Sequence, residues 1–435
     1  MSLFIGVDLG TSGCRAVAID MAGQIQMQLE TETPQPYCQG QKVEQEPKVW
    51  WQATQRVLKK LSQKINPTQV AAIAIDGTSA TLVLVDGQGN PVYPGIMYND
   101  NRATQEAEQI QQVAPKSTAA HGSTATLAKL LWCHHQQLTR PVRYVMHQAD
   151  WITAQLSGRY GISDVNNCLK LGYDAINQEW PIWLQRLQLP PEWFPQVVEP
   201  GTVIGTLKPE LSKYFGFLPN TLIIAGTTDS TAALIATGAQ NIGEAVTCLG
   251  STLVLKVIAE QPIFEPRYGI YSQPLFHQWL VGGASNTGGA VLLKYFSLAQ
   301  LQVMTPLLTP TLRTSLDYYP LLSPGERFPI SDPQLTPRLT PRPQENIKFF
   351  QGLLESITRI ERQGYELLHQ LGAPYPTKIY TTGGGANNPA WTVMRELELS
   401  VPIITNNSTP AAYGTALLAK RKMPLCECCQ PDKNN

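Results

Sequence analysis

This 435-residue chain lacks a long apolar run, an excess of either charge and a recognisable targeting segment. No stretch approaches the ~18 consecutive apolar residues of a membrane-spanning helix, so no membrane partner is expected. Lysine plus arginine and aspartate plus glutamate number 33 each, and this balance excludes the electrostatic footprint of a nucleic-acid-binding protein. The N-terminus enters a strand pattern without a basic segment or an apolar signal core, which favours a cytoplasmic location.

Cysteine is also too sparse and irregular for a disulfide framework. Five cysteines are scattered singly and are interpreted as small buried or surface side chains: Cys14, Cys38, Cys133, Cys168 and Cys248. Three more, Cys426, Cys428 and Cys429, lie together near the end, but without a second ligand pair. A metal or redox role is therefore not favoured for them. The apolar content of 43% and the length instead indicate an ordinary globular protein of two or three domains.

The stretch from Leu3 to Asp20 predicts two short strands joined by a tight Gly/Thr/Ser turn. Backbone amides converging in such a turn form an anion-binding concavity, to which Gly10, Thr11 and Ser12 would contribute. Asp8 ends the first strand, and a carboxylate beside a phosphate site requires a cation between them. Asp8 is therefore interpreted as a Mg²⁺ ligand. An ordinary hairpin would give the same local pattern.

The same pattern occurs again from Ala245 to Ile258, around Leu249-Gly250-Ser251-Thr252. Leu-Gly-Thr-Ser and Leu-Gly-Ser-Thr between apolar strands suggest one turn present in both halves of a duplicated chain. Two phosphate turns facing a cleft suit a nucleoside triphosphate. We therefore expect an N-terminal domain over residues 1–238 and a C-terminal domain over residues 239–435.

Three polar segments in the first half are candidates for substrate binding. The strand 70–75 runs into Asp76-Gly77-Thr78-Ser79-Ala80-Thr81, a small polar turn at the sheet edge where α/β proteins bind ligands. Asp100 and Arg102 precede a helix over 103–113, where they could form a cap with a surface ion pair or grip a polyol. Asp229 opens a small-residue helix, so it is either an N-cap or a base that deprotonates an attacking hydroxyl.

Glycine-rich segments in the second half point to close backbone contact with a ligand. Gly288 lies in the run 282–290, which precedes a helix and could equally serve helix packing. The strand 378–381 runs into Gly383-Gly384-Gly385, which suits the nucleoside end of a nucleotide. Trp391 follows, either stacked on adenine or buried in the core.

The remaining periodicity predicts helices over 48–65, 126–135, 148–158, 346–371 and 411–418. The polar, Pro/Gln-rich stretch 31–48 is expected to be a loop. Alternation of short strands with helices indicates an α/β fold.

Taken together, these motifs resemble the FGGY carbohydrate kinases, a family with a duplicated ribonuclease-H-like, actin-like fold. The matching segments occur in family order over nearly the whole chain: Gly6-Val7-Asp8-Leu9-Gly10-Thr11-Ser12, Asn99-Asp100-Asn101-Arg102, Lys129-Leu130-Leu131-Trp132, Gly226-Thr227-Thr228-Asp229, Leu249-Gly250-Ser251-Thr252, Pro320-Leu321-Leu322-Ser323-Pro324-Gly325-Glu326-Arg327 and Gly383-Gly384-Gly385. The resemblance implies two actin-like ATPase domains with a cleft between them.

It also implies ATP-dependent phosphorylation of a sugar hydroxyl, with ATP and Mg²⁺ as cofactors. By this resemblance Asp229 is the catalytic base and Asp8 lies near Mg²⁺ and the substrate. Other roles follow in the same way. Phosphates would contact Gly10, Thr11, Ser12, Gly250, Ser251 and Thr252; the nucleotide would also contact Gly288, Gly384, Gly385, Asn388 and Trp391; the sugar would contact Asp8, Ser79, Asp100, Arg102 and Asp229.

Xylulokinases usually carry Ser-Gly-Gln-Met-His where this chain has the turn 76–81. The turn is closer to that of ribulokinase-like members, and the short chain resembles compact cyanobacterial and plant kinases that prefer D-ribulose. D-ribulose is therefore the expected substrate, with Ser79 contacting it. The alternatives are a xylulokinase or other polyol kinase, and a sugar-independent actin-like ATPase or binding module. A monomer and a homodimer are both compatible with the sequence.

Overall fold

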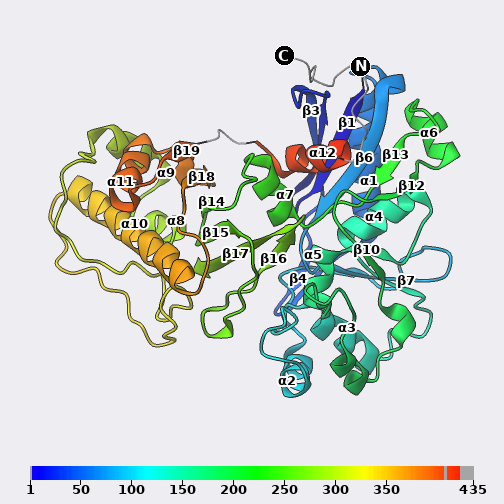
Figure 1. Cartoon of the computed structure of the whole chain (residues 1–435), viewed down its shortest axis with the longest axis horizontal. Helices are drawn as coiled ribbons and strands as arrows, with labels where there is room; N and C mark the ends of the chain where they lie inside the picture. Colours follow the sequence, from blue (N-terminus) through cyan, green and yellow to red (C-terminus); the bar gives the residue numbers. More distant parts are fainter. Residues whose placement is uncertain (1, 406–408, 422–435) are drawn as a thin grey trace, which may run out of the picture. The chain divides into compact units, whose positions relative to one another are not determined.

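The computed structural model describes residues 2–405 and 409–421, which form two compact units (Figure 1). Of the described residues, unit 1 comprises 2–236 together with 410–421, and unit 2 comprises 237–405 and 409. The sequence-based division at residue 238 placed the last helix, α12 (Ala411–Arg421), in the second domain. The structure instead packs α12 in unit 1, because Ala412 and Ala416 are buried against Phe4 of the first strand.

Unit 1 is built on a six-stranded sheet in the order β12-β13-β6-β1-β2-β3. The strands are β1 (Leu3–Leu9), β2 (Gly13–Ile19), β3 (Ile25–Glu32), β6 (Val70–Gly77), β12 (Val203–Thr206) and β13 (Leu222–Ile224). Strands β1, β6 and β13 are parallel, so their carboxyl ends meet at one edge. Side chains alternate along β1: Phe4 faces α12, whereas Ile5 and Val7 belong to the core with α1 (Pro47–Ser62) and α4 (Gln148–Ser157).

A five-stranded sheet, β4-β5-β8-β7-β9, and its helices complete most of unit 1. The remaining elements of the unit are β4 (Tyr37–Gln39), β5 (Lys42–Gln45), β7 (Leu82–Val85), β8 (Gly95–Ile96), β9 (Tyr144–His147), β10 (Ile162–Asp164), β11 (Gln196–Val198), α2 (Thr104–Val113), α3 (Thr126–His135), α5 (Val165–Cys168), α6 (Pro209–Phe215) and α7 (Asp229–Ala236). The prediction of a loop over 31–48 was wrong in part, since β3 continues to Glu32 and β4 and β5 follow. Pairing of β5 with β8, fifty residues away in sequence, stabilises this polar stretch as strands.

Unit 2 repeats this sheet with the order β16-β17-β15-β14-β18-β19. Its elements are β14 (Glu244–Leu249), β15 (Leu253–Ala259), β16 (Gln273–Leu275), β17 (Gln278–Ser285), β18 (Lys378–Thr382), β19 (Ile403–Thr405), α8 (Gly289–Tyr295), α9 (Leu298–Met304), α10 (Asn346–Gln370) and α11 (Pro389–Leu399). The antiparallel β17-β15-β14 followed by parallel β18 and β19 match β3-β2-β1 followed by β6 and β13. The duplication predicted from the two hairpins is therefore present in the topology.

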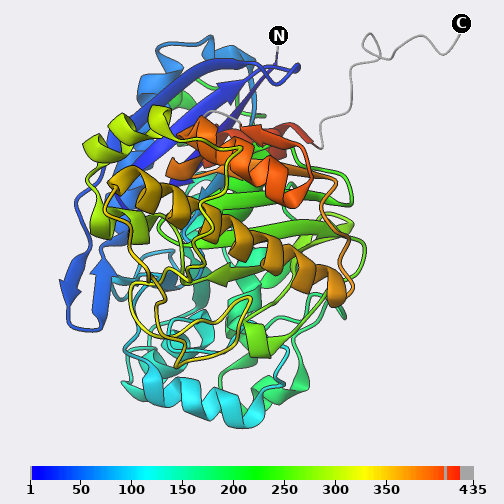
Figure 2. The same cartoon turned by 90° about the vertical axis from the view of Figure 1, so that its left-hand side faces the viewer.

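Helix α10 lies across one face of the unit 2 sheet, as both views show (Figures 1 and 2). Its apolar stripe packs on the sheet because Leu353, Ile357 and Ile360 recur at helical spacing and are buried. The predicted helices over 103–113, 126–135, 148–158 and 346–371 agree with the structure to within about two residues at each end.

Candidate active site

Three carboxyl groups gather at the carboxyl edge of the unit 1 sheet. Asp8 on β1 and Asp76 on β6 are paired in register between the parallel strands. Asp229 is the first residue of α7, and an isolated parallel bridge between Gly77 and Thr228 places its segment beside β6. The predicted pair Asp8 and Asp229 therefore belongs to one sheet edge.

Asp76 is the group that sequence reasoning missed as part of this site. The available signal was its position, because it follows an apolar strand in the same way as Asp8. It is fully buried, and the hydroxyl of Thr415 on α12 donates to its Oδ2. Burial first, and then the charge of Asp8, raise the pKa of Asp76 well above its usual range.

Asp8 is 5% exposed, and burial raises the pKa of its carboxyl. A hydrogen bond with Asp76 and the charge of Arg15, whose Nη1 lies 3.4 Å from Asp8 Oδ2, act in the opposite direction. Asp229 is half-buried, and its Oδ1 accepts a hydrogen bond of 2.7 Å from the amide of Ser230. Its carboxylate thus stands at the start of a helix, where negative charge is favoured.

Two glycines make this gathering sterically possible. A Cβ on Gly226 would lie 1.6 Å from the carbonyl oxygen of Ile75, so only glycine lets the segment before Asp229 lie directly on β6. A Cβ on Gly6 would lie 2.0 Å from the carbonyl oxygen of Ala412, so glycine also admits α12 against β1. These close approaches hold the three carboxyl-bearing segments together.

The predicted phosphate turn lies between β1 and β2. The amide of Gly10 donates to the carbonyl of Gly13 at 3.0 Å, so it is engaged within the turn. Thr11 is half-buried and Ser12 is exposed. Hydroxyls, together with the carboxylate of Asp8, are the groups that this turn presents to a phosphate or to Mg²⁺.

The small polar turn after β6 spans Thr78–Thr81. The amide of Thr81 bonds the carbonyl of Thr78 at 3.4 Å, and their hydroxyls lie 2.6 Å apart. The Oε1 of Gln148 accepts from both the amide and the hydroxyl of Thr78, at 3.0 and 2.8 Å. Ser79 is half-buried, and its hydroxyl has no hydrogen-bond partner within residues 2–405 and 409–421. It is the hydroxyl of the turn that is available to a ligand.

Asp100 and Arg102 form a closed ion pair. The Asp100 side chain is 0% exposed; its oxygens accept from the amide of Val43 at 2.6 Å and from Arg102 Nη2 at 2.5 Å. Arg102 also pairs with Glu44 at 2.8 Å, and its guanidinium stacks 4.7 Å from the ring centre of Trp132. Asp100 thus anchors Arg102 inside the protein, and a sugar contact by Asp100 would require breaking these bonds. The contact of Asp100 and Arg102 with the sugar stays a prediction.

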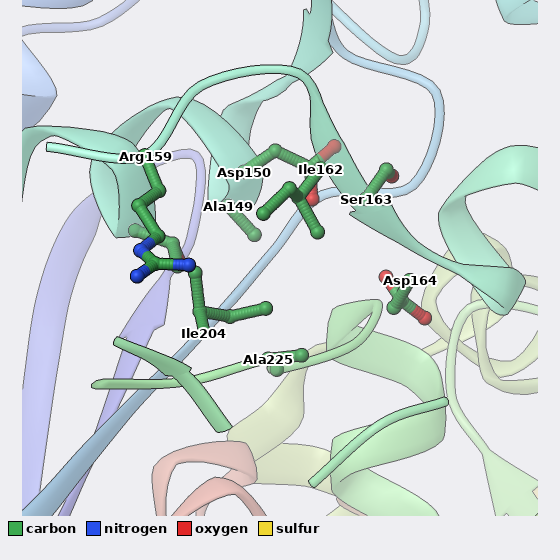
Figure 3. A pocket seen from close by; sticks show the side chains of 10 residues that line it. Ala149, Asp150, Arg159, Ile162, Ser163, Asp164, Ile204 and Ala225 are labelled. Carbon is green, nitrogen blue, oxygen red and sulfur yellow. The ribbon is translucent and has the colours of Figure 1, made fainter. Parts of the chain in front are cut away.

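A buried network supports the segment before Asp229. Asp164 Oδ2 accepts from the amide of Asn166 at 2.9 Å and from the hydroxyl of Thr227 at 3.3 Å. Burial and the charge of Asp150 raise the pKa of Asp164 to about 7. Asp164 also borders a small pocket whose opposite side carries Arg159 (Figure 3). This network joins β10 to the loop that leads to the candidate base.

In unit 2, two glycine-rich segments converge on the turn Leu249–Thr252. A Cβ on Gly383 would lie 2.6 Å from the Leu249 carbonyl, and one on Gly288 would lie 2.7 Å from that of Ser251. The amide of Gly289 donates to the carbonyl of Gly250 at 2.8 Å. No atom lies within 4 Å of a Cβ on Gly384, so that glycine faces open space. The turn and both glycine segments therefore form one continuous surface.

This surface borders a cavity of about 480 Å³, within the range of ligand pockets. Six residues predicted to bind the nucleotide line it: Gly250, Ser251, Gly384, Gly385, Asn388 and Trp391. Thr252 and Gly288 are not among the residues that line it. Sequence reasoning missed the opposite wall, formed by Leu298, Leu301, Gln302 and Thr305. The capping box between Ser297 and Gln300 was the available signal for the helix that forms it.

Asn388 and Trp391 shape the floor of the cavity. Asn388 caps α11 by accepting from the amide of Trp391 at 3.0 Å, and its Nδ2 reaches Thr305 at 3.3 Å. Trp391 is 2% exposed, and its indole donates to Thr358 on α10 at 2.9 Å. Of the two interpretations left open for Trp391, the structure places it in the core, with one ring edge beneath Gly385.

The remaining candidates are simpler. Cys14, Cys133 and Cys168 are buried, and burial raises the pKa of each thiol. The terminal cluster of Cys426, Cys428 and Cys429 lies outside the described residues. Within the described ranges, no helix is long and apolar enough to cross a membrane, and no group of three or more His, Cys, Asp or Glu side chains is arranged to hold a metal.

A duplicated β-β-β-α-β sheet with a polar turn in each half defines the class of two-domain, actin-like ATPase folds. Solved structures confirm this class. A xyloylose kinase from Brucella ovis matches with a TM-score of 0.87 and 24% identity, over 96% of this chain and 90% of that one. A xylulose kinase from Lactobacillus acidophilus matches with a TM-score of 0.84 and 21% identity, over 97% and 89%.

The family then follows from sequence comparison. The chain belongs to the FGGY family of carbohydrate kinases: the N-terminal domain of that family matches residues 3–236 and the C-terminal domain matches residues 247–423. A xylulose kinase of Escherichia coli (strain K12) is 26% identical over 414 residues, covering 90% of this chain and 84% of that protein. A xylulose kinase of Klebsiella pneumoniae is 24% identical over 445 residues, covering 96% and 89%. The resemblance predicted from the motifs is confirmed, and the chain is a sugar kinase.

Proposed function

We propose that this sugar kinase transfers the γ-phosphoryl group of ATP to the terminal hydroxyl of D-ribulose, giving D-ribulose 5-phosphate. The observation that carries the choice of sugar is the turn Thr78–Thr81, which presents the free hydroxyl of Ser79 and lacks the Met-His pair typical of xylulokinases. D-xylulose is the second candidate, because the relatives described above are xylulose kinases.

In the proposed reaction Asp229 accepts the proton of the sugar hydroxyl as its oxygen attacks the γ-phosphorus. The bond between that phosphorus and the β,γ-bridging oxygen breaks, and ADP leaves. Asp229 suits this role because it is half-buried at the sheet edge that also carries Ser79 and Asp8. Ser79 would orient the sugar by a hydrogen bond from its side chain.

The donor set at Asp8 fits Mg²⁺. This ion usually takes one or two carboxylates and completes its shell with water and substrate phosphates, which does not require a cage of three protein carboxylates. Asp8 would hold it, with Thr11 and Ser12 nearby, and when bound it would neutralise charge that develops on the phosphates. Gly250, Ser251, Gly384, Gly385 and Asn388 would hold ATP in the cavity of unit 2, whose volume suits a nucleotide.

The test is ADP release from Mg²⁺-ATP with D-ribulose, D-xylulose, L-ribulose, glycerol or no sugar. We expect kcat/KM to be highest for D-ribulose. Preference for another polyol would refute the choice of substrate but leave the mechanism intact. ADP release that is indifferent to every sugar would refute the kinase proposal and restore the sugar-independent ATPase.

The variant Asp229→Asn distinguishes a catalytic base at this position from a residue that only caps helix α7. Asp229→Asn preserves the side-chain oxygen that accepts from Ser230 but cannot take a proton, so we expect sugar-dependent turnover to fall by at least a factor of ~10² while ATP binding is retained. Asp86→Asn, in a surface turn of the same unit, is the matched control and should remain near wild type. A near-wild-type rate for Asp229→Asn would remove Asp229 from the role of base.

A further inference from the structure

Lys129 on α3 is a buried ammonium group without a carboxylate partner. Its side chain is 0% exposed, and its Nζ donates to the carbonyl oxygens of Ala80, at 3.0 Å, and Met97, at 2.7 Å. Within the described part of the chain it forms no ion pair. Burial lowers the pKa of its amine to about 7. The charge of Asp100 acts in the opposite direction but does not offset burial. Because burying an amine without a directly paired carboxylate is costly, its two backbone contacts need an explanation.

The two carbonyls belong to the two segments predicted to bind the sugar. Ala80 lies in the turn Thr78–Thr81, two residues before β7 begins at Leu82. Met97 immediately follows β8, and its carbonyl also accepts from the amide of Asp100 at 3.1 Å. Strands β7 and β8 pair through Leu82 and Ile96. Lys129 therefore joins the two segments that flank this pair of residues, next to the end of the strand pairing. One side chain therefore ties the Ser79 turn to the segment that carries Asp100 and Arg102.

The turn needs such support because of the conformation of Ala80. Its φ is +69°, a left-handed value that glycine adopts readily and alanine does not. Ala80 occupies the third position of a four-residue turn closed by the bond from Thr81 to Thr78, where a positive φ is typical of glycine. A hydrogen bond to its carbonyl fixes the peptide plane that follows. The direction of Ser79, one residue earlier, depends on the same turn.

We propose that Lys129 is a positioning residue that holds the turn Thr78–Thr81 in its left-handed form, so that Ser79 is directed at the sugar. The proposal rests on the proposed function insofar as it concerns the sugar. Lys129 itself does not contact the substrate. It acts through the carbonyls of Ala80 and Met97, and it sets the apparent affinity for the pentulose and not that for the nucleotide, whose cavity lies wholly in unit 2.

Lys129→Met, which keeps the length of the side chain and removes the donors, tests the kinetic consequence. We expect KM for D-ribulose to rise at least tenfold, while KM for ATP and sugar-independent ATP hydrolysis change by less than twofold. The control is Lys59→Met, because Lys59 also donates to a backbone carbonyl, that of Tyr214, but at the surface. It should leave both KM values within twofold. An unchanged KM for the sugar in Lys129→Met overturns the proposal.

Rescue distinguishes positioning of the turn from general stabilisation of the core. Glycine adopts a positive φ without strain. The double variant Lys129→Met with Ala80→Gly should therefore have a kcat/KM for the sugar at least threefold higher than that of Lys129→Met alone. Ala80→Gly alone should stay within threefold of wild type. If the double variant is no better than Lys129→Met, the left-handed turn is not what Lys129 maintains, and the proposal is overturned.

Hydrogen exchange of the protein without ligands provides a readout that does not depend on the substrate. In Lys129→Met the amides of residues 78–81 should exchange at least tenfold faster, whereas those of β13 and of unit 2 keep their wild-type rates. Uniformly faster exchange throughout unit 1 would indicate a general loss of stability and overturn the proposal. If wild-type protein turns over no pentulose, the proposed function fails, and the exchange pattern still decides whether Lys129 holds the turn.

Discussion

The buried ion pair between Arg395 on α11 and Glu361 on α10 leads to a quantitative prediction for unit 2. Both side chains are 0% exposed, and two hydrogen bonds of 2.7 Å join the guanidinium to the carboxylate. Arg395 Nη1 also donates to Thr381 on β18 at 2.8 Å, and Glu361 accepts from Thr247 on β14 at 2.6 Å. The pair thus connects both helices to β14 and β18, the strands that carry the turns predicted to bind the nucleotide.

Arg395→Met should destabilise unit 2 strongly, because it leaves Glu361 charged and buried, with Thr247 as its one remaining donor among the described residues. Removing one partner of a buried pair costs about 3–5 kcal/mol. Unit 2 spans residues 237–409, and for a domain of this size each kcal/mol lowers Tm by roughly 2–4 °C. The expected decrease is therefore on the order of 10 °C in the transition of unit 2.

The measurements are the Tm from thermal unfolding and the free energy of unfolding from urea titration. In the urea titration, hydrogen exchange of peptides from α10 and β18 reports unit 2 separately from unit 1. Arg362→Met is the matched control: Arg362 also joins α10 to α11, through Glu398 at 2.9 Å, but its side chain is 35% exposed. A pair with that exposure contributes at most about 1 kcal/mol. Arg395→Met should therefore cost several times more than Arg362→Met.

The double variant Arg395→Met with Glu361→Met tests the reason for the loss. It removes the uncompensated charge and fills the space with apolar atoms, so it should be more stable than Arg395→Met alone. A cost below about 1 kcal/mol for Arg395→Met, or a double variant less stable than the single one, would refute the reasoning.

Two further predictions concern the glycine turn and the network behind the candidate base. Gly383→Ala should abolish detectable nucleotide binding in calorimetry, because φ at Gly383 is +84° and a Cβ would meet the Leu249 carbonyl at 2.6 Å. Gly384→Ala should fold normally, because its Cβ meets nothing within 4 Å. Equal behaviour of the two variants would contradict this prediction. Because burial raises the pKa of Asp164 to about 7, the folded state retains a proton that the unfolded state releases near pH 4, and stability should fall as pH rises between these values. Relative to Asp164→Asn, the free energy of unfolding of the wild type should decrease by up to ~1.4 kcal/mol per pH unit over that window, and a flat difference would show that Asp164 is ionised throughout.

Much of the architecture could be predicted from local patterns. The hairpins around Gly10 and Gly250 are short apolar strands interrupted by Gly/Ser/Thr, and both occur where they were predicted. The amphipathic helix over 346–370 was predicted from its 3.6-residue apolar period. These features depend on contacts between near neighbours, so the order of residues is sufficient to indicate them.

The errors and omissions share one cause, which is pairing between distant residues. The strands β4 and β5 are polar and owe their order to pairing with each other and with β8. Helix α12 has the small-residue pattern of any closely packed helix. It packs in unit 1 because Gly6 and Gly414, which have no Cβ, allow close backbone contact with the neighbouring segments. Trp391 matched both a stacking platform and a core residue until its indole was found bonded to Thr358.

The sequence alone indicated the class of protein and predicted where a site would lie: Asp8, Ser79 and Asp229 each follow a strand pattern, and the glycine runs predict a close approach of the backbone to a ligand. Tertiary structure decided which of these groups act together. Asp76 joins Asp8 because parallel β1 and β6 place them in register, and Asp100 is occupied because Val43 and Arg102 bind it from separate segments. Such contacts depend on register and burial between segments far apart in the chain, and the spacing of residue types does not encode them.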